Sequence, residues 1–137
     1  MAGKQRAVVV NSGLHWPNGL TLDNDKHRLY WVDGWHHKLE YLDLITNIRV
    51  TLISSPIVLP HPFGLTLLGD YLYCTDWQLG SVYRANKENG GNVSAFITGL
   101  GQPMDIHGYN LSENRTLGQY SKFVTRGTFI TSCVSFI

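Results

Sequence analysis

The sequence repeats itself with a period near 43 residues. The segments Pro17–Leu22 and Leu29–Asp33 return as Pro62–Leu67 and Leu72–Asp76. The two copies open 45 residues apart, and a third opens at Pro103, 41 residues further on. Periods of about 40 to 45 residues are typical of four-stranded propeller blades and of paired helices, and each unit has to bury its apolar face against the next.

The residue types within each copy favour strands. Leucines flank Thr21 and Thr66, which is the two-residue period of a pleated strand. Turn-forming Asp, Asn and Gly residues separate the runs. The sequence predicts strands at 19–23, 27–32, 38–44 and 49–54, and again at 64–67, 71–75, 81–86 and 93–98. We also expect 7–10 to match the outermost strand of a preceding blade, and 103–107 the innermost strand of a following one.

Size and composition narrow the function classes. With 137 residues, 43% apolar and 15% charged, the chain is predicted to be one globular domain. A net charge of +1 without basic clustering favours neither nucleic acid nor an anionic membrane as a partner. Two cysteines 59 residues apart indicate neither a disulfide framework nor a metal site. We expect no signal peptide and no direct membrane insertion, because both terminal apolar runs are too short.

The two copies resemble the low-density lipoprotein receptor class B repeat, whose blades contain the motif Tyr-Trp-Thr-Asp. The motif reads Tyr-Trp-Val-Asp at 30–33 and Tyr-Cys-Thr-Asp at 73–76, and the segments 86–87 and 103–106 also match. This resemblance covers about residues 7–108. It implies an all-β fold, part of a six-bladed YWTD β-propeller, with two complete four-stranded blades and two partial ones. Within the family, the segments 15–19 and 61–63 look most like the Wnt co-receptor branch, with endocytic lipoprotein receptors as the alternative.

The resemblance also implies a division of the chain. Residues 1–108 would be a partial propeller with blades at about 17–61 and 62–102, and 109–137 a tail foreign to the family or disordered. A ring of six such blades needs about 250 residues, and the EGF-like module that follows these propellers is not recognisable. We therefore expect a truncated, alternatively spliced or incompletely predicted product that folds poorly alone, because unpaired blade faces stay exposed.

The most recognisable residues are predicted to hold the fold rather than to do chemistry. Aromatic side chains of the motif should pack between blades, and the carboxylates should bind neighbouring backbone, as buried aspartates must. Cys74 is interpreted as an inert thiol in a loosely packed position, since no basic neighbour would lower its pKa. The structural motif residues are Tyr30, Trp31, Asp33, Tyr73 and Asp76.

One end of the blades is rich in aromatic residues. In an antiparallel meander the connections into the first strand and between the second and third strands share an end, and three of four tryptophans and four of six histidines fall there. Exposed aromatic residues on one face indicate a recognition surface, although a single loop tryptophan is often only a cap over the core. By resemblance to Wnt co-receptor propellers, which bind short extended peptides on this face, the ligand contacts would be Trp16, Asn18, His61, Phe63, Trp77 and Met104.

The resulting hypothesis is a non-enzymatic, protein- or peptide-binding segment of a lipoprotein receptor-related cell-surface receptor, without metal or cofactor. Its partners would be an extracellular ligand and the remaining blades and EGF-like module of the parent protein. The sequons at Asn92, Asn110 and Asn114 are glycosylation candidates and favour the extracellular side of the plasma membrane. The alternative is a gluconolactonase-like metal-dependent hydrolase, in which Asn18 and Asp105 would be the ligands.

Overall fold

The computed structural model describes residues 6–110, 121–125 and 128–130, and within these ranges the chain is built from strands without any helix. Two antiparallel four-stranded sheets have their strands in sequence order. Blade 1 contains β1 (Pro17–Asp23), β2 (Arg28–Asp33), β3 (Lys38–Asp43) and β4 (Arg49–Ser54). Blade 2 contains β5 (Pro62–Leu68), β6 (Tyr71–Asp76), β7 (Ser81–Asn86) and β8 (Ser94–Ile97).

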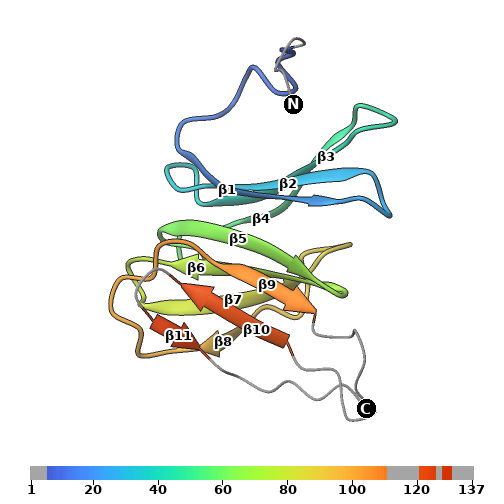
Figure 1. Cartoon of the computed structure of the whole chain (residues 1–137). Helices are drawn as coiled ribbons and strands as arrows, with labels where there is room; N and C mark the ends of the chain where they lie inside the picture. The colour runs from blue at the N-terminus through green and yellow to red at the C-terminus, as the bar shows by residue number, and fades with distance from the viewer. Residues whose placement is uncertain (1–5, 111–120, 126–127, 131–137) are drawn as a thin grey trace, which may run out of the picture.

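A third sheet follows blade 2. It has the order β11, β10, β9, formed by β9 (His107–Asn110), β10 (Ser121–Thr125) and β11 (Thr128–Ile130). Figure 1 shows blade 1 above blade 2, with the third sheet drawn across the lower part of blade 2. No helix able to span a membrane occurs in the part of the chain that the structure describes.

The eight predicted blade strands are confirmed, and none of their ends differs from the prediction by more than two residues. The largest differences are at the starts of β1 and β5. Each of these strands already pairs with its neighbour at the proline, and the register then shifts before the regular ladder begins. The predicted strand at 7–10 is wrong. Those residues are mostly exposed and form no ladder with any described strand, and a strand cannot persist without a partner for its backbone groups.

The expected innermost strand at 103–107 is also corrected, since β9 begins only at His107. Before that point the backbone is held by side chains: the Thr75 hydroxyl donates to the Met104 carbonyl at 2.7 Å, and Asp105 Oδ1 accepts from the Ile106 N–H. The division placed after residue 108 lies inside β9, which pairs with β10. Backbone pairing therefore crosses the expected domain boundary.

The main core lies between the two blades. Blade 1 contributes one face of β2 and β3, and blade 2 the facing side of β5, β6 and β7. As predicted, Tyr30, Trp31 and Tyr73 are buried. The members of this core are Tyr30, Val32, Leu39, Tyr41, Leu59, Leu65, Leu72, Cys74 and Ala85.

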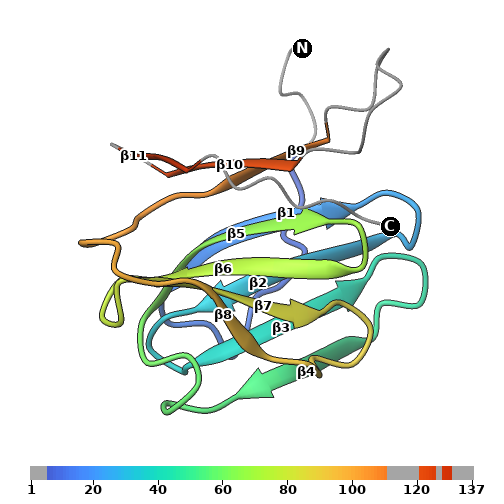
Figure 2. The ribbon, with the colours of Figure 1, turned by 90° about the horizontal axis from the view of Figure 1, so that it is seen from below.

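The first strands of the sheets converge at one edge. Figure 2 shows β1, β5 and β9 near one another, with β4 at the opposite edge. A Cβ added to Gly19 would lie 2.4 Å from the Leu65 nitrogen, and one added to Gly64 would lie 2.7 Å from the Met104 carbonyl oxygen. The glycine in each Pro-x-Gly segment is required because any side chain would collide with the backbone at the start of the following repeat. Leu20, Leu22, Leu65 and Leu67 lie on these inner strands.

A polar clamp joins the blades at the end opposite to the aromatic residues. Lys87 Nζ donates to Asp23 Oδ2 at 2.7 Å with both side chains buried, and the Tyr30 hydroxyl donates to the Lys87 carbonyl at 3.2 Å. Arg28 Nη1 donates to Glu88 Oε2 at 2.6 Å. Burial alone would raise the pKa of Asp23, but the Lys87 ammonium and nearby backbone N–H groups hold it below its ordinary value.

Candidate functional site

Asp33, the last residue of the first motif, is fully buried and organises the aromatic end of blade 1. Its Oδ2 accepts from the backbone N–H of His15 at 2.7 Å. Its Oδ1 accepts from the backbone N–H of Trp35 at 3.1 Å and of His36 at 3.0 Å, and more weakly from that of Trp16 at 3.3 Å. One carboxylate therefore ties the segment entering β1 to the turn between β2 and β3.

These hydrogen bonds determine the charge state of Asp33. Burial alone would raise its pKa, because desolvation disfavours a charged carboxylate. The backbone N–H groups of His15 and His36, with the His36 ring, outweigh that effect and hold the pKa of Asp33 well below its ordinary value. The anchor is therefore ionised at neutral pH.

Asp76 has the same function in blade 2. Its Oδ2 accepts from the His61 N–H at 2.8 Å, and its Oδ1 accepts from the N–H groups of Gln78 and Leu79 at 3.0 and 2.9 Å. Both motif aspartates thus bind the backbone of the loops at the aromatic end. The expected hydrogen bonding of these carboxylates to neighbouring backbone is therefore observed.

The anchored loops bring five rings into a continuous row, which we name the aromatic cluster: His15, Trp16, Trp35, His61 and Trp77. Trp16 meets Trp35 edge-on with centroids 5.1 Å apart, and His15 lies 4.7 Å from Trp35. Trp16 and His61 are 5.8 Å apart, and His61 and Trp77 are 5.3 Å apart, so the row crosses from blade 1 to blade 2. Such pairs favour edge-to-face and tilted geometries. The three tryptophans nevertheless remain 44%, 53% and 37% exposed, in chain order.

A groove runs along this cluster, which we name the aromatic groove. Its lining includes the rings of Trp16, Trp35 and His61. His37 Nδ1 donates to the Pro60 carbonyl at 3.0 Å and so ties the turn after β2 to the connection between β4 and β5. The full lining is Trp16, Gly34, Trp35, His37, Pro60, His61 and Gln78.

A second open groove lies over the starts of β1 and β5, and we name it the inner-strand groove. Phe63 and Met104 supply its apolar side chains, and Asp105 supplies an exposed carboxylate. Asn18 also lines it, but its Nδ2 donates to the Pro62 carbonyl at 3.0 Å and so links the blades. The full lining is Pro17, Asn18, Gly19, Phe63, Gly64, Met104 and Asp105.

The six residues predicted as ligand contacts therefore divide between two places. Trp16 and His61 line the aromatic groove, and Trp77 stacks on His61 at its side. The other three, Asn18, Phe63 and Met104, line the inner-strand groove. The site prediction did not include His15, Trp35, His37 and Pro60, although the sequence had placed the segments that contain all four at this end. The repeat could have added these residues to the predicted contacts, because the loops that contain them are equivalent in the two copies.

The residues considered as metal ligands are hydrogen-bonded or ion-paired within the protein. Among the described residues no group of three or more His, Cys, Asp and Glu side chains is arranged to hold an ion. Asn18 uses its amide nitrogen on the Pro62 carbonyl, and the Asp105 carboxylate lies 3.1 Å from the ring of His107. His36 Nδ1 lies 3.1 Å from Asp33 Oδ2. Each of these groups has a protein partner.

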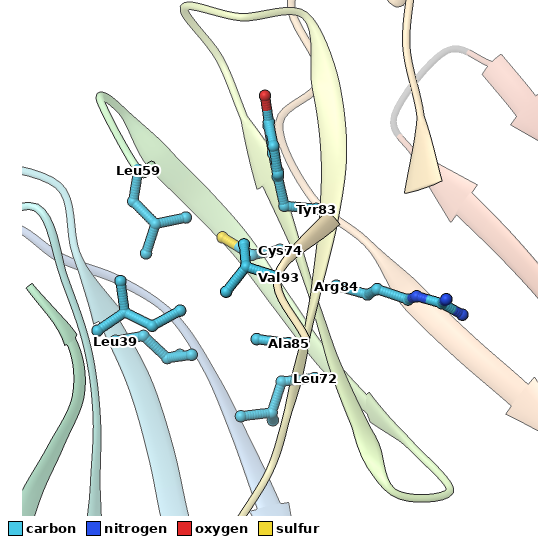
Figure 3. A pocket seen from close by; sticks show the side chains of 9 residues that line it. Leu39, Leu59, Leu72, Cys74, Tyr83, Arg84, Ala85 and Val93 are labelled. Carbon is cyan, nitrogen blue, oxygen red and sulfur yellow. The ribbon is translucent and has the colours of Figure 1, made fainter. Parts of the chain in front are cut away.

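Cys74 is enclosed by the core between the blades. Figure 3 shows its sulfur facing Leu39 and Leu59, while the Arg84 side chain points away. A small apolar cavity lies beside it, as expected where cysteine replaces the larger tryptophan. Burial strongly raises the pKa of the Cys74 thiol, so the reactive thiolate is disfavoured.

The three glycosylation candidates differ in how much of each sequon lies within the described residues. Asn92 is exposed just before β8, in a left-handed conformation with φ of 54°, and Ser94 of its sequon, the first residue of β8, is exposed as well. Asn110 is the last residue of β9, but its sequon ends outside the described residues, and the Asn114 sequon lies wholly outside them.

Comparison with known proteins finds no matching protein-family model. The chain is 39% identical to human low-density lipoprotein receptor-related protein 5-like protein over 106 residues, which is 77% of this chain and 41% of that protein. It is 42% identical over 89 residues to human low-density lipoprotein receptor-related protein 5, covering 65% of this chain and 5% of the relative. Mouse low-density lipoprotein receptor-related protein 4 is 42% identical over 87 residues, which is 64% of this chain and 4% of that protein. The chain thus spans less than half of each of these relatives.

Solved structures agree on the fold. A chain of the crystal structure of a nidogen/laminin complex, a YWTD β-propeller, matches with a TM-score of 0.63 and 29% identity. The match covers 75% of this chain and 38% of that one. A chain of Kuenenia stuttgartiensis hydrazine synthase matches with a TM-score of 0.58 at 14% identity, over 94% of this chain and 38% of that one, and shows likeness of fold alone.

Proposed function

The two blades are low-density lipoprotein receptor class B repeats within a YWTD β-propeller, and we propose that this segment binds an extended peptide or protein loop at its aromatic end. The peptide would lie across the aromatic groove and reach the inner-strand groove. The observation that supports this proposal is the aromatic cluster, whose three tryptophans stay partly exposed although their backbone is held in place. Asp33 accepts from the N–H groups of Trp16 and Trp35, and the Trp77 N–H donates to the His61 carbonyl.

Such an arrangement has the features of a binding hot spot. Tryptophan is enriched among the residues that dominate binding energy, because it buries a large area at a small cost in conformational entropy. Here the supporting loops are already ordered by buried carboxylates, so little further ordering is needed on binding. The Asp105 carboxylate in the inner-strand groove would favour a ligand with a cationic or amide group at that end.

The relatives named above are lipoprotein receptor-related proteins. We therefore propose that the segment belongs to a cell-surface receptor of this type, with its propeller on the extracellular side. A Wnt co-receptor-like function is preferred to an endocytic one on the resemblance of the loops at 15–19 and 61–63. The hydrolase alternative receives less support, because the relatives named above are lipoprotein receptor-related proteins.

The test uses the full chain and a phage-displayed library of random twelve-residue peptides, selected on immobilised protein. For the enriched peptides we expect Trp16→Ala to weaken binding by about 30-fold, which corresponds to about 2 kcal/mol and is typical of an aromatic anchor. Asn24→Ala, in the exposed turn at the other end, should leave affinity unchanged. Circular dichroism checks that both variants stay folded.

Enriched peptides that bind wild type and Trp16→Ala equally would contradict the proposal. The structure also changes what Asn18→Ala is expected to do. Because this amide links the blades through Pro62, its removal should cost about 1 kcal/mol of stability. A change in peptide affinity at Asn18 therefore has to be read beside the stability of the variant.

A further inference from the structure

The two blades differ at the residue that follows the motif aspartate. Gly34 N donates to the Trp16 carbonyl at 2.9 Å, and Trp77 N donates to the His61 carbonyl at 3.0 Å. The motif aspartate of each blade also accepts from the N–H groups of the next two residues in the same way. Gly34 in blade 1 is therefore equivalent to Trp77 in blade 2, and Trp16 is equivalent to His61.

In blade 2 the side chain at this position covers its neighbour. The Trp77 indole packs on the His61 ring, with centroids 5.3 Å apart and planes tilted by 47°. Gly34 has no side chain that could cover Trp16 in the same way. The exposure of the two covered positions differs accordingly, since Trp16 is 44% exposed and His61 is half-buried.

The glycine is matched to its neighbour Asn18. A Cβ added to Gly34 would lie 2.8 Å from Asn18 Nδ2 and 3.8 Å from Trp16 Cε3. The Asn18 amide thus takes the space next to Gly34 and donates from there to the Pro62 carbonyl. Blade 2 has Phe63, which has no amide, in the place of Asn18. Glycine at position 34 therefore permits the link between the blades and leaves the Trp16 ring partly uncovered.

The aromatic groove beside Gly34 favours an uncharged side chain. Its lining contains no carboxylate, lysine or arginine. Asp33, next to Gly34 in the chain, is fully buried, and its oxygens already accept from backbone N–H groups. A cationic side chain in this groove would therefore lose water without gaining a direct ionic partner, which is unfavourable.

We propose that the aromatic groove takes one aromatic side chain of the ligand, which covers Trp16 as Trp77 covers His61 in blade 2. This inference rests on the proposed function and specifies the residue that the bound peptide must supply. Trp16 and Trp35 meet at 71°, and aromatic rings pack well in tilted and edge-to-face arrangements. A third ring can therefore pack on one of these walls and meet the edge of the other.

Gly34 is then the residue that determines whether this ring is accepted, and the repeat supplies a variant that closes the groove. Gly34→Trp combined with Asn18→Phe gives blade 1 the pair that blade 2 has in Trp77 and Phe63. The second substitution removes the amide that the new Cβ would meet. Gly34 does not have a positive φ, so its backbone accepts a side chain.

The first part of the test uses the twelve-residue peptides selected on the full wild-type chain. We expect the enriched peptides to share one aromatic residue at a fixed position of their alignment. Replacing it by alanine should weaken binding by about 30-fold, as for an aromatic anchor. Replacing it by arginine should weaken binding at least as much, because the groove has no ionic partner for it.

The second part compares two variants of the chain. The double variant Gly34→Trp with Asn18→Phe should bind the same peptides at least about tenfold more weakly than Asn18→Phe alone. The single variant is the matched control, because both variants lose the hydrogen bond to Pro62. Circular dichroism checks that both are folded, and if the double variant is not, the peptide substitutions on wild type decide.

The remaining outcomes separate this inference from the proposed function. Enriched peptides that need Trp16 but anchor through an aliphatic residue or an arginine would overturn the inference and leave the proposed function standing. Equal affinity of the double variant and Asn18→Phe would overturn the inference in the same way. A selection without enriched peptides, or peptides that are indifferent to Trp16→Ala, would overturn both.

Discussion

Replacing Asp33 by asparagine removes the charge from the aromatic end of blade 1 while keeping the shape of the side chain. Asp33 is fully buried, and both of its oxygens accept hydrogen bonds from backbone N–H groups. An asparagine keeps one acceptor oxygen but presents an NH2 group in place of the other. If that oxygen faces Trp35 and His36, the new NH2 group faces the His15 N–H, which is 2.7 Å from Oδ2 in the native chain.

The expected cost follows from these contacts. A hydrogen bond to a charged group contributes about 1.5 to 3 kcal/mol, and a buried N–H left without an acceptor costs about 1 to 3 kcal/mol. Because the donor–donor contact combines one lost charged bond with weakening of the others, we expect Asp33→Asn to lower the free energy of unfolding by about 2 to 4 kcal/mol. The segment containing His15 and Trp16 should also loosen.

The repeat supplies a matched control at the other end of the blade. Asp43 caps the turn between β3 and β4, and Asn86 has the same function in blade 2 with the same two N–H donors. Asparagine is therefore sufficient in that turn. We expect Asp43→Asn to change the free energy of unfolding by less than about 0.5 kcal/mol, as is usual for surface substitutions.

The assay is urea unfolding at one fixed, low protein concentration, followed by tryptophan fluorescence, since Trp16 and Trp35 lie on the Asp33 anchor. The pH dependence gives a second measurement. The pKa of Asp33 is lowered in the folded chain, so the stability that it contributes is complete above the unfolded pKa of about 3.9. That stability is lost as pH falls through the folded pKa.

Wild type should therefore lose more stability than Asp33→Asn when the pH is lowered below about 4. If Asp33→Asn and Asp43→Asn lowered the free energy of unfolding by the same amount, the reasoning would be refuted. The charge and the second acceptor oxygen of Asp33 would then contribute nothing to stability. An Asp33→Asn variant with native stability and unchanged tryptophan fluorescence would refute it as well.

Three further predictions concern the blades. Lys87→Met should lower the free energy of unfolding by about 3 to 5 kcal/mol in the same urea assay, because Asp23 would stay buried without its cation. The exposed change Lys26→Met should lower it by less than about 1 kcal/mol. Equal losses for the two variants would argue against the clamp. Cys74 should resist a thiol reagent in the native Cys133→Ser chain and react fully in denaturant, because burial raises its pKa and excludes the reagent; rapid native labelling would show that the blades open there. When the chain is secreted from animal cells, Asn92→Gln should abolish one glycan, detected as a loss of one glycosidase-sensitive mobility shift, and unchanged mobility would contradict this assignment.

The blades themselves could be predicted from the sequence. Alternation of apolar residues, turn residues and the 43-residue period are local signals, and each strand end fell within two residues of its predicted position. The burial of Tyr30 and Tyr73 and the hydrogen bonds of Asp33 and Asp76 to backbone were also predicted from the sequence. The strand expected at 7–10 failed because alternation shows what a segment can form but not whether a partner lies beside it.

The arrangement of the candidate site depended on contacts between the copies. Sequence placed Trp16 and His61 at one end of the blades, but only the packed structure shows their rings in one row, with Asn18 joined to the Pro62 carbonyl. The same holds for the clamp of Lys87 and Asp23, which are 64 residues apart in the chain.

Leu20 and Leu65 show most clearly what the local sequence determines and what the packing of the sheets decides. They occupy equivalent positions in near-identical segments, and the sequence predicts the same strand for both. One is 65% exposed and the other 4% exposed. Local sequence determines which side of a strand a side chain takes, because the pleat has a fixed period. Whether that side is buried is decided by the neighbouring sheet, since burial is a property of two surfaces brought together.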